Sequence, residues 1–520
     1  MTSTTLRRVL GCALVLILGL AIAASAQNAP RQQPPEVKDL TAAFRLEDPA
    51  ARLKELERIK AAFPASQYMA MIDQNILGAK IELAPTLDAV LALQKEMLAK
   101  AKGPDRLQSP FMAADQILGH PKVKSFDAAK IVAAVLNYQD EAVKAAGETD
   151  TYQGVPADQK NDFKAYFLNG FHLLIAGAQL GAGDAAKAQT ALDAYIKAGG
   201  SPDGAYSYTL GGVCEKTNKP KEAYEAYLNA AAEKYSDAAA KAKALYTKLN
   251  GKADGFEAAL EAKLRALPYH PEAYKAPADW KGKAVLAEVF TGSECPPCVG
   301  ADLGFDGLIE AYPAQYLAIL EYHLPIPRPD PMINAATEKR QQYYGVNSTP
   351  STFFDGEAKL GGGGNRGMAG GKFKAYKAEI DPRIAAAPAL ILKAKAARTG
   401  DIIKVDCEAD KAVPGVEINV VLAQPVEKYA GSNGIAFHKM VVRDLAVLPA
   451  GSKSASFDLA ASEKAADEYL TNFEKTSTRF QGYKFAERHA KIDRQGLRVV
   501  VFAQAKDTKK VLNTVVLEVK

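Results

Sequence analysis

The hydrophobic pattern of this chain changes twice, and each part of the pattern is typical of a different class of structure. Residues 35–274 place apolar side chains at helical spacing and are rich in Ala, Leu, Lys and Glu. Residues 281–384 alternate strand patterns with amphipathic helices, and residues after 388 show short strand patterns between polar turns. At 520 residues the chain is also too long for one core. We therefore expect a multidomain fold with an all-α helical-repeat domain (27–275), an α/β domain (281–384) and an all-β, sandwich-like C-terminal domain (388–520).

Residues 1–26 have the pattern of a secretory signal peptide. Arg7 and Arg8 precede an apolar run from Val9 to Ala23, and the small residues Ala-Ser-Ala follow as a cleavage site. An uncleaved anchor helix and a lipid anchor at Cys12 are the alternatives. No later run of about 20 apolar residues could span a bilayer. We expect a periplasmic or secreted protein without a transmembrane span once the signal is removed.

Two segments of the helical part align on each other with a period of 35 residues. The alignment places Ile175 on Leu210, Gly183 on Asn218, Ala188 on Ala223 and Leu192 on Tyr227. Small residues at the helix crossing and a Gly or Asn at the turn resemble the tetratricopeptide repeat, a helical hairpin that stacks on its neighbours. The resemblance implies a surface that binds a protein partner.

Composition and charge exclude several classes of function. With 48% hydrophobic and 24% charged residues, the chain has the composition of a globular protein. A net charge of +5 without a long Lys or Arg run gives no electrostatic case for nucleic acid. Four cysteines follow the signal, too few for a disulfide scaffold. We expect Cys214 and Cys407 to be buried core thiols; the alternative is a disulfide between them, which would require the two domains to meet.

The remaining cysteines, Cys295 and Cys298, form a CxxC pair in the stretch "SECPPC" between a strand pattern and a helix pattern. A thiolate at a helix N-terminus is stabilised by unpaired backbone N–H groups, so Cys295 is the expected nucleophile. Cys298, one turn further and more buried, is the expected resolving thiol. The alternatives are a permanent disulfide and half of a zinc site. One CxxC without a second ligand pair is poor evidence for zinc, so we expect no metal and no cofactor beyond the disulfide.

The order of strand, CPPC, helix and a later "STPS" before a hairpin resembles the thioredoxin superfamily over residues 281–384. The resemblance implies that Pro350 is a cis proline against the cysteine pair and that the backbone of Thr349 binds substrate as an added strand. "EVFTGSECPPC" and "YAGSNGIAFHKMVVRDL" are also similar to secreted thioredoxin-like proteins of unassigned function that carry a β-domain. Their activity is undefined, so this likeness implies architecture more than function.

Two features depart from the thioredoxin pattern. Glu294 stands where many thioredoxins have Trp, and its charge should raise the pKa of the neighbouring thiol. The buried acid that commonly assists the resolving thiol would occupy the position of Val289, while Glu288 lies one residue away on the opposite strand face. Glu288 is either the proton shuttle or an ordinary solvent or interdomain contact.

Three further features have simpler structural interpretations. His323 fits a structural histidine at a strand end better than a residue of the redox site. "LGGGGNRGMAGG" lacks the Lys-Ser/Thr end of a phosphate-binding loop and fits a link to the closing helix. "PRPDPM" fits a rigid loop better than a lid over the cysteines.

Two functional hypotheses follow. The leading one is an exported thiol–disulfide oxidoreductase that acts on protein thiols and disulfides and recruits its partner through the helical repeats. The alternative is a non-catalytic envelope binding or assembly protein, in which the Cys295–Cys298 disulfide is structural.

Overall fold

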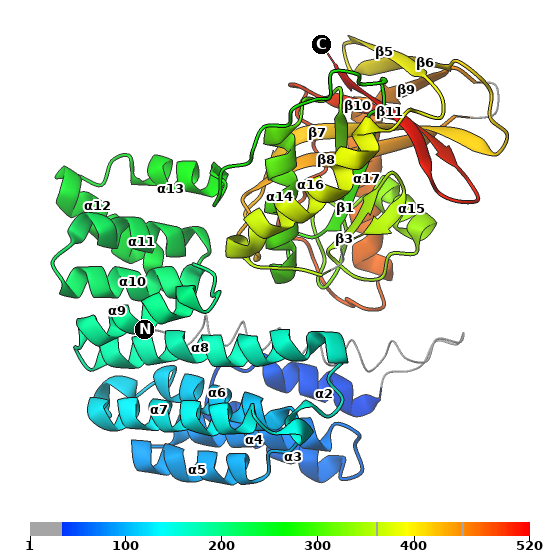
Figure 1. Cartoon of the computed structure of the whole chain (residues 1–520). Coiled ribbons are helices and arrows are strands. Elements are labelled where there is room, and N and C mark those ends of the chain that lie inside the picture. Colours follow the sequence, from blue (N-terminus) through cyan, green and yellow to red (C-terminus); the bar gives the residue numbers. More distant parts are fainter. Residues whose placement is uncertain (1–33, 360–361, 449–451, 520) are drawn as a thin grey trace. The chain divides into compact units, whose positions relative to one another are not determined.

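The computed structural model describes residues 34–359, 362–448 and 452–519, and the chain divides into two compact units (Figure 1). Residues 1–256 form the first unit and residues 257–520 the second. The predicted signal peptide lies outside the described residues. Among the residues that are described, no helix combines the length and the apolar character needed to cross a membrane.

The described part of the first unit is helical, as the sequence predicts. Asp side chains cap several of its helices: Asp127, for example, accepts hydrogen bonds from two backbone N–H groups of the following first turn. The helices are α2 (Pro35–Phe44), α3 (Pro49–Ala62), α4 (Met69–Leu83), α5 (Leu87–Ala99), α6 (Asp105–Leu118), α7 (Ala128–Ala145), α8 (Lys160–Gly181), α9 (Ala185–Lys197), α10 (Gly204–Lys216), α11 (Pro220–Ala232) and α12 (Ala238–Asn250), and α13 (Phe256–Arg265) crosses into the second unit.

The two segments that align in the sequence form helical hairpins, α8–α9 and α10–α11. Their aligned turn residues, Gly183 and Asn218, both adopt positive φ, at 86° and 57°. The aligned residues Ala188 and Ala223 have no exposed surface, which lets the helices of each hairpin approach closely. The predicted repeat-like architecture is confirmed for this pair.

An eight-stranded mixed sheet organises the second unit. Its order is β11-β10-β7-β8-β2-β1-β3-β4, with β2 parallel to β1 and β3 antiparallel to it. The predicted hairpin turn at Asp355 and Gly356 is present between β3 and β4, with positive φ at both residues. The strands are β1 (Val285–Thr291), β2 (Leu317–His323), β3 (Ser351–Phe354), β4 (Glu357–Lys359), β7 (Val416–Lys428), β8 (Phe437–Val447), β10 (Arg498–Ala505) and β11 (Val511–Glu518).

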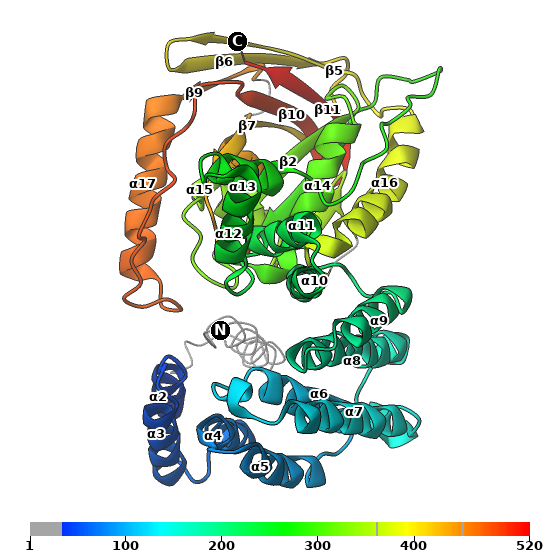
Figure 2. The ribbon, with the colours of Figure 1, turned by 90° about the vertical axis from the view of Figure 1, so that its left-hand side faces the viewer.

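The central strand β1 is buried along its whole length because helices cover both faces of this sheet. Val285, Ala287 and Val289 pack on one face, in the core with α14 (Val299–Ala311) and α16 (Ala369–Ala385). Leu286 and Phe290 pack on the other face, in the core that includes α15 (Ala335–Tyr344). Figure 2 shows α17 (Leu459–Thr476) on the side of the sheet away from α16.

The β-rich C-terminal segment contributes to two sheets. Strands β5 (Leu392–Thr399), β6 (Ile402–Ala409) and β9 (Ser454–Asp458) form a small antiparallel sheet over the core of β7 and β10. The other C-terminal strands extend the eight-stranded sheet, since β8 pairs with β2 at Val441 and Glu321. The sheet is therefore continuous across the segment boundary placed at residues 384–388, and the boundaries drawn from the sequence remain predictions.

Candidate functional site

The cysteine pair lies where β1 passes into α14. Cys295 and Cys298 form a disulfide, and a 3-10 turn, Pro296–Cys298, leads from Cys295 directly into the helix. The pair thus occupies the start of a helix after a strand, as predicted. Neither cysteine has exposed surface, so the expectation that Cys298 is the more buried of the two is wrong. Neighbouring loops cover both residues.

The residues expected to bind substrate lie beside Cys295. The Thr349–Pro350 peptide bond is cis, as the resemblance implies. The Thr349 hydroxyl donates to the carbonyl of Ile326 at 2.9 Å and lies 3.4 Å from Cys295 Sγ, while the Thr349 carbonyl oxygen lies 3.8 Å from the same sulfur. The structure brings together both cysteines, Thr349 and Pro350, but the pairing of Thr349 with a substrate strand remains a prediction.

Glu288 lies on the opposite face of the sheet from α14 and makes an ion pair there. Its carboxylate binds the Arg340 guanidinium through two hydrogen bonds of 2.7 and 2.9 Å and accepts further bonds from Tyr322 and Tyr344. Glu288 is fully buried and Arg340 is nearly so. This arrangement joins β1 to α15 and positions Glu288 away from the helix that carries Cys298.

Two buried acids that we did not predict lie on the α14 face. Asp302 follows Cys298 by four residues, which places both side chains on one face of the helix start. Glu321 on β2 is the register partner of Val289, the position at which the sequence lacked an acid. Burial raises the pKa of both carboxyls well above their usual values, and the neighbouring Asp306 carboxyl adds to this effect. The spacing of Asp302 was visible in the sequence, whereas Glu321 required the strand register.

Other polar groups next to Asp302 and Glu321 are also buried. The Thr291 hydroxyl, at the end of β1, lies close enough to the Asp302 carboxyl to lower its pKa, against the larger opposing effect of burial. One carboxyl oxygen of Glu321 and the hydroxyl of Ser293 are buried and have no hydrogen-bond partner within the part of the chain that is described. A buried polar region thus lies between the disulfide loop, β2 and α14, and protonated carboxyls suit it better than charged ones.

A third acid near the pair is held in its charged form. Asp330, in the Pro-rich loop, is fully buried, which by itself disfavours the carboxylate. The His323 ring at 2.9 Å and the backbone N–H groups of Ser293 and Met332 outweigh burial and lower its pKa to about 2. Asp330 therefore ties the Pro-rich loop to the end of β1, in agreement with the rigid-loop interpretation.

His323 belongs to a buried histidine pair next to this loop. Its ring contacts that of His438 edge-on at 4.9 Å, and His438 binds the carbonyl of Tyr429. Burial lowers the pKa of His438 to about 3, so this ring is neutral at physiological pH. No cluster of three His, Cys, Asp or Glu side chains among the described residues is arranged to hold a metal ion.

The glycine-rich segment after β4 does more than link two elements. Its described residue Gly364 donates to the carbonyl of Pro297 at 2.7 Å and accepts from the N–H of Gly300 at 2.8 Å. A Cβ atom added at Gly363 would lie 2.3 Å from Pro297 Cβ. This segment packs directly on the cysteine loop, and a side chain at Gly363 would force it away.

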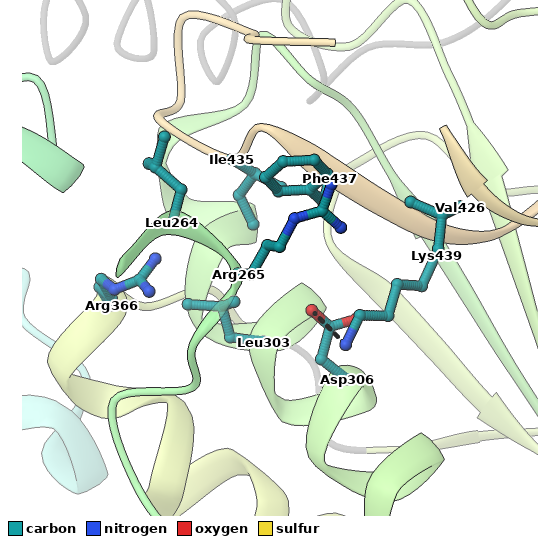
Figure 3. Close-up of a pocket in the computed structure, with 9 residues that line it drawn as sticks. All are labelled: Leu264, Arg265, Leu303, Asp306, Arg366, Val426, Ile435, Phe437 and Lys439. Atoms are coloured by element: carbon teal, nitrogen blue, oxygen red, sulfur yellow. Dashed lines mark ion pairs between the residues drawn. The ribbon is translucent and has the colours of Figure 1, made fainter. Parts of the chain in front are cut away.

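A cavity of about 200 Å³ lies between α13, α14 and β8 (Figure 3). Its charged lining residues have internal partners: Lys439 pairs with Asp306 at 3.4 Å, and Arg265 pairs with Glu261 and stacks on Phe437. Arg366 donates to the carbonyl of Lys263 in α13 and to that of Ala266, just after the helix. We assign no ligand to this cavity, because its charges already compensate one another.

Cys214 and Cys407 are free, buried thiols, as predicted. Burial raises the pKa of both, which keeps them protonated and unreactive. Among the cysteines of the described residues, Cys295 and Cys298 are therefore the pair that forms a disulfide.

Comparison with known proteins adds no assignment: no family model matches the chain, and no curated protein matches it. The likeness to thioredoxins thus depends on the chain's own features. A buried strand, a CxxC disulfide at the start of the next helix and a parallel second strand are consistent with a thioredoxin-like segment.

Proposed function

We propose that this protein is an exported thiol–disulfide oxidoreductase that acts on protein partners through Cys295 and Cys298. The observation that carries the proposal is the disulfide at the start of α14, with the Thr349–Pro350 peptide against Cys295. A structural staple does not need backbone groups of another loop beside one sulfur, whereas an exchange catalyst uses such groups to hold the partner chain.

The reaction would proceed by two exchanges. In the reducing direction, the Cys295 thiolate attacks one sulfur of a partner disulfide, and the electron pair of that bond leaves on the second partner sulfur, which takes up a proton. Cys298 then loses its proton and attacks Cys295 Sγ. The bond to the partner breaks, the partner leaves as a dithiol, and the Cys295–Cys298 disulfide forms. Oxidation of a partner dithiol is the same sequence in reverse.

Asp302 is our candidate for the group that exchanges a proton with Cys298. It lies one helical turn away and is buried, and burial raises the pKa of its carboxyl well above the usual value. Glu321 lies in the same buried region and repels a second negative charge, which favours a proton on this pair of acids. Glu288, our earlier candidate, is already engaged by Arg340.

The helical unit would recruit the partner. Stacked helical hairpins offer extended surfaces for proteins, and α8–α11 form two such hairpins. We also propose export to the periplasm or the cell exterior, where disulfide chemistry proceeds, on the strength of the signal-like sequence of residues 1–26.

One observation favours the second function, a binding or assembly protein with a permanent disulfide. Both sulfur-bearing residues are fully buried, and the catalytic cysteine of an exchange enzyme must meet its partner. The two functions differ in whether the folded protein ever exposes Cys295.

Trapping of the mixed disulfide tests the choice. Cys298→Ser removes the resolving thiol. Cys295 should then remain covalently bound to a model protein that contains a disulfide and is added in excess. A thiol-sensitive adduct seen by non-reducing electrophoresis, absent in Cys295→Ser, supports the oxidoreductase. Equal amounts of adduct in both variants would contradict it.

A further inference from the structure

The loop between β7 and β8, residues 429–436, lies over the strand end that leads into the cysteine pair. We call residues 430–435 of this loop the lid. The N–H of Asn433 donates to the carbonyl of Ser293 at 3.1 Å, and the Asn433 side-chain amide donates to the carbonyl of Gly292 at 3.2 Å. The lid thus holds the two residues that precede Glu294 and Cys295.

Glu294 itself binds the lid. Its carboxylate accepts a hydrogen bond of 3.2 Å from the backbone N–H of Ser432. Glu294, which stands where many thioredoxins have tryptophan, therefore makes a structural contact. This contact lies at the edge of the site, because Glu294 is only half-buried. Glu294 acts as a latch between the cysteine loop and the lid.

The lid fits the site closely on both sides of the cysteines. A Cβ atom at Gly431 would lie 2.2 Å from the carbonyl oxygen of Ser293, so only glycine fits at this position. Further along the lid, Ile435 packs in an apolar cluster with Val299, the residue that follows Cys298. The lid therefore contacts the chain both before Cys295 and after Cys298.

The base of the lid is joined to the sheet, and its tip contacts the cysteine loop. The N–H of Tyr429 donates to the carbonyl of Ala436 and closes the hairpin at its base. Links from the tip to the cysteine loop include the three hydrogen bonds of Ser432 and Asn433 and the packing of Gly431 and Ile435. A hairpin tip attached in this way can open without disturbing the sheet.

We propose that the lid selects the thiols that reach the disulfide: it excludes small-molecule thiols and opens when a protein partner competes for the Glu294 and Asn433 contacts. The proposal rests on the proposed oxidoreductase function. It names the partner class as a protein chain whose backbone N–H groups can form hydrogen bonds in place of the lid. The buried disulfide is then protected from the thiol pool of its compartment and reacts with its own partner.

The chemical step explains why access decides the rate. An attacking thiolate must approach Cys295 Sγ, form a bond to it and displace the electron pair onto Cys298 Sγ, which then takes up a proton. Neither residue has exposed surface when the lid is closed, so attack by a thiol must await opening. A substitution that weakens the lid should therefore speed reduction in proportion to the open fraction.

The test measures the rate at which dithiothreitol reduces the pair in the full mature chain, with thiols alkylated at intervals and Cys295 and Cys298 counted by mass. Asn433→Ala and Gly431→Ala should each raise this rate about three- to tenfold, the effect expected from losing one or two hydrogen bonds. Gly371→Ala is the matched control, since a Cβ there meets no atom within 4 Å. Asn433→Ala keeps the test valid if Gly431→Ala fails to fold.

A pair of substitutions at Glu294 separates the latch from simple charge repulsion. Glu294→Gln keeps a hydrogen-bond acceptor for Ser432 N–H, and Glu294→Ala removes it. Acceleration in Glu294→Ala alone supports the latch. Equal acceleration in both variants would show that the charge of Glu294 repels the incoming thiolate, and it would overturn the latch.

The outcomes also separate the lid from the function that it serves. If the parent resists reduction while the lid variants are reduced rapidly, the lid is supported even where the parent traps no partner and the oxidoreductase function fails. If the lid variants and Gly371→Ala are all reduced at the parent's rate, or none is reduced before unfolding, the lid proposal is overturned.

Discussion

At the scale of single residues, the acids around the disulfide differ in protonation because they differ in partners. A histidine ring and two backbone N–H donors lower the pKa of Asp330, whereas burial and the neighbouring Asp306 raise the pKa of Asp302 against a smaller opposing effect of Thr291. Cys295 and Cys298 could be predicted from the sequence because their spacing defines them, and Pro350 could be predicted because of the resemblance to thioredoxins. Glu321 could not, because only the strand register places it beside Val289.

Asp302→Asn should stabilise the fold at high pH. Burial raises the pKa of Asp302 in the folded state above its unfolded value, so the stability that this group contributes at low pH is lost as pH rises through the folded pKa. The neutral amide removes that loss. We expect a Tm increase of about 2 to 4 °C at pH 8 for each ~1 kcal/mol recovered, and little change at pH 4.

The same variant tests the proton role of Asp302 separately. If Asp302 receives the proton of Cys298, Asp302→Asn should slow the resolving step by about 100-fold, the lower range for general acid–base groups. Quenched-flow decay of the mixed disulfide measures this step. A decay rate like the parent's at every pH would exclude Asp302 from proton transfer.

Glu288→Gln should destabilise the protein while leaving the redox chemistry intact. The change leaves the buried Arg340 guanidinium without its anion, a loss of about 3 kcal/mol or more in the free energy of unfolding. Urea unfolding measures the loss, and alkylation in redox buffers measures the midpoint. A slower decay of the mixed disulfide in quenched flow, with unchanged stability, would restore Glu288 as the proton shuttle.

At the scale of elements, close helix and loop contacts explain where glycine is required. The repeat pattern of α8–α11 was predictable because a 35-residue period repeats both the turn and the small residues at the crossing. The packing of the glycine-rich segment on Pro297 was not, since flexible composition says nothing of what a loop contacts.

Gly211→Ala tests the close packing of α10 on α11. A Cβ at Gly211 would lie 2.7 Å from the ring of Tyr227, which is fully buried, so overpacking should cost about 1 to 3 kcal/mol. Gly181→Ala, at the end of α8, is the matched control, because its Cβ meets no atom within 4 Å. Urea unfolding followed by circular dichroism compares the two. Equal stability would mean that the hairpins tolerate a wider crossing.

At the scale of the whole molecule, one sheet serves both the cysteine segment and the β-rich segment. Alternating strand patterns predicted the C-terminal strands correctly, but they could not reveal that β8 would pair with β2, because pairing between distant strands depends on three-dimensional closure. The same pairing positions the β7–β8 loop beside the cysteines, so the lid is a consequence of sheet order.

Export should leave a mature chain that begins at Gln27. Expression of the full chain in a bacterial host, fractionation and intact mass determination measure this directly. We expect the processed mass in the periplasmic fraction. An unprocessed chain in the membrane fraction would instead support an uncleaved anchor.

The measurement that tests the central claim most directly is a redox titration of the mature chain, equilibrated with a protein dithiol–disulfide of known potential so that the lid can open, with thiols trapped by alkylation and Cys295 and Cys298 identified by mass. We predict a reversible two-electron midpoint for the folded protein, with values near about −270 mV typical of reductants and near about −120 mV of oxidants. A pair that stays oxidised until the protein unfolds would contradict the oxidoreductase and leave the disulfide as a structural staple.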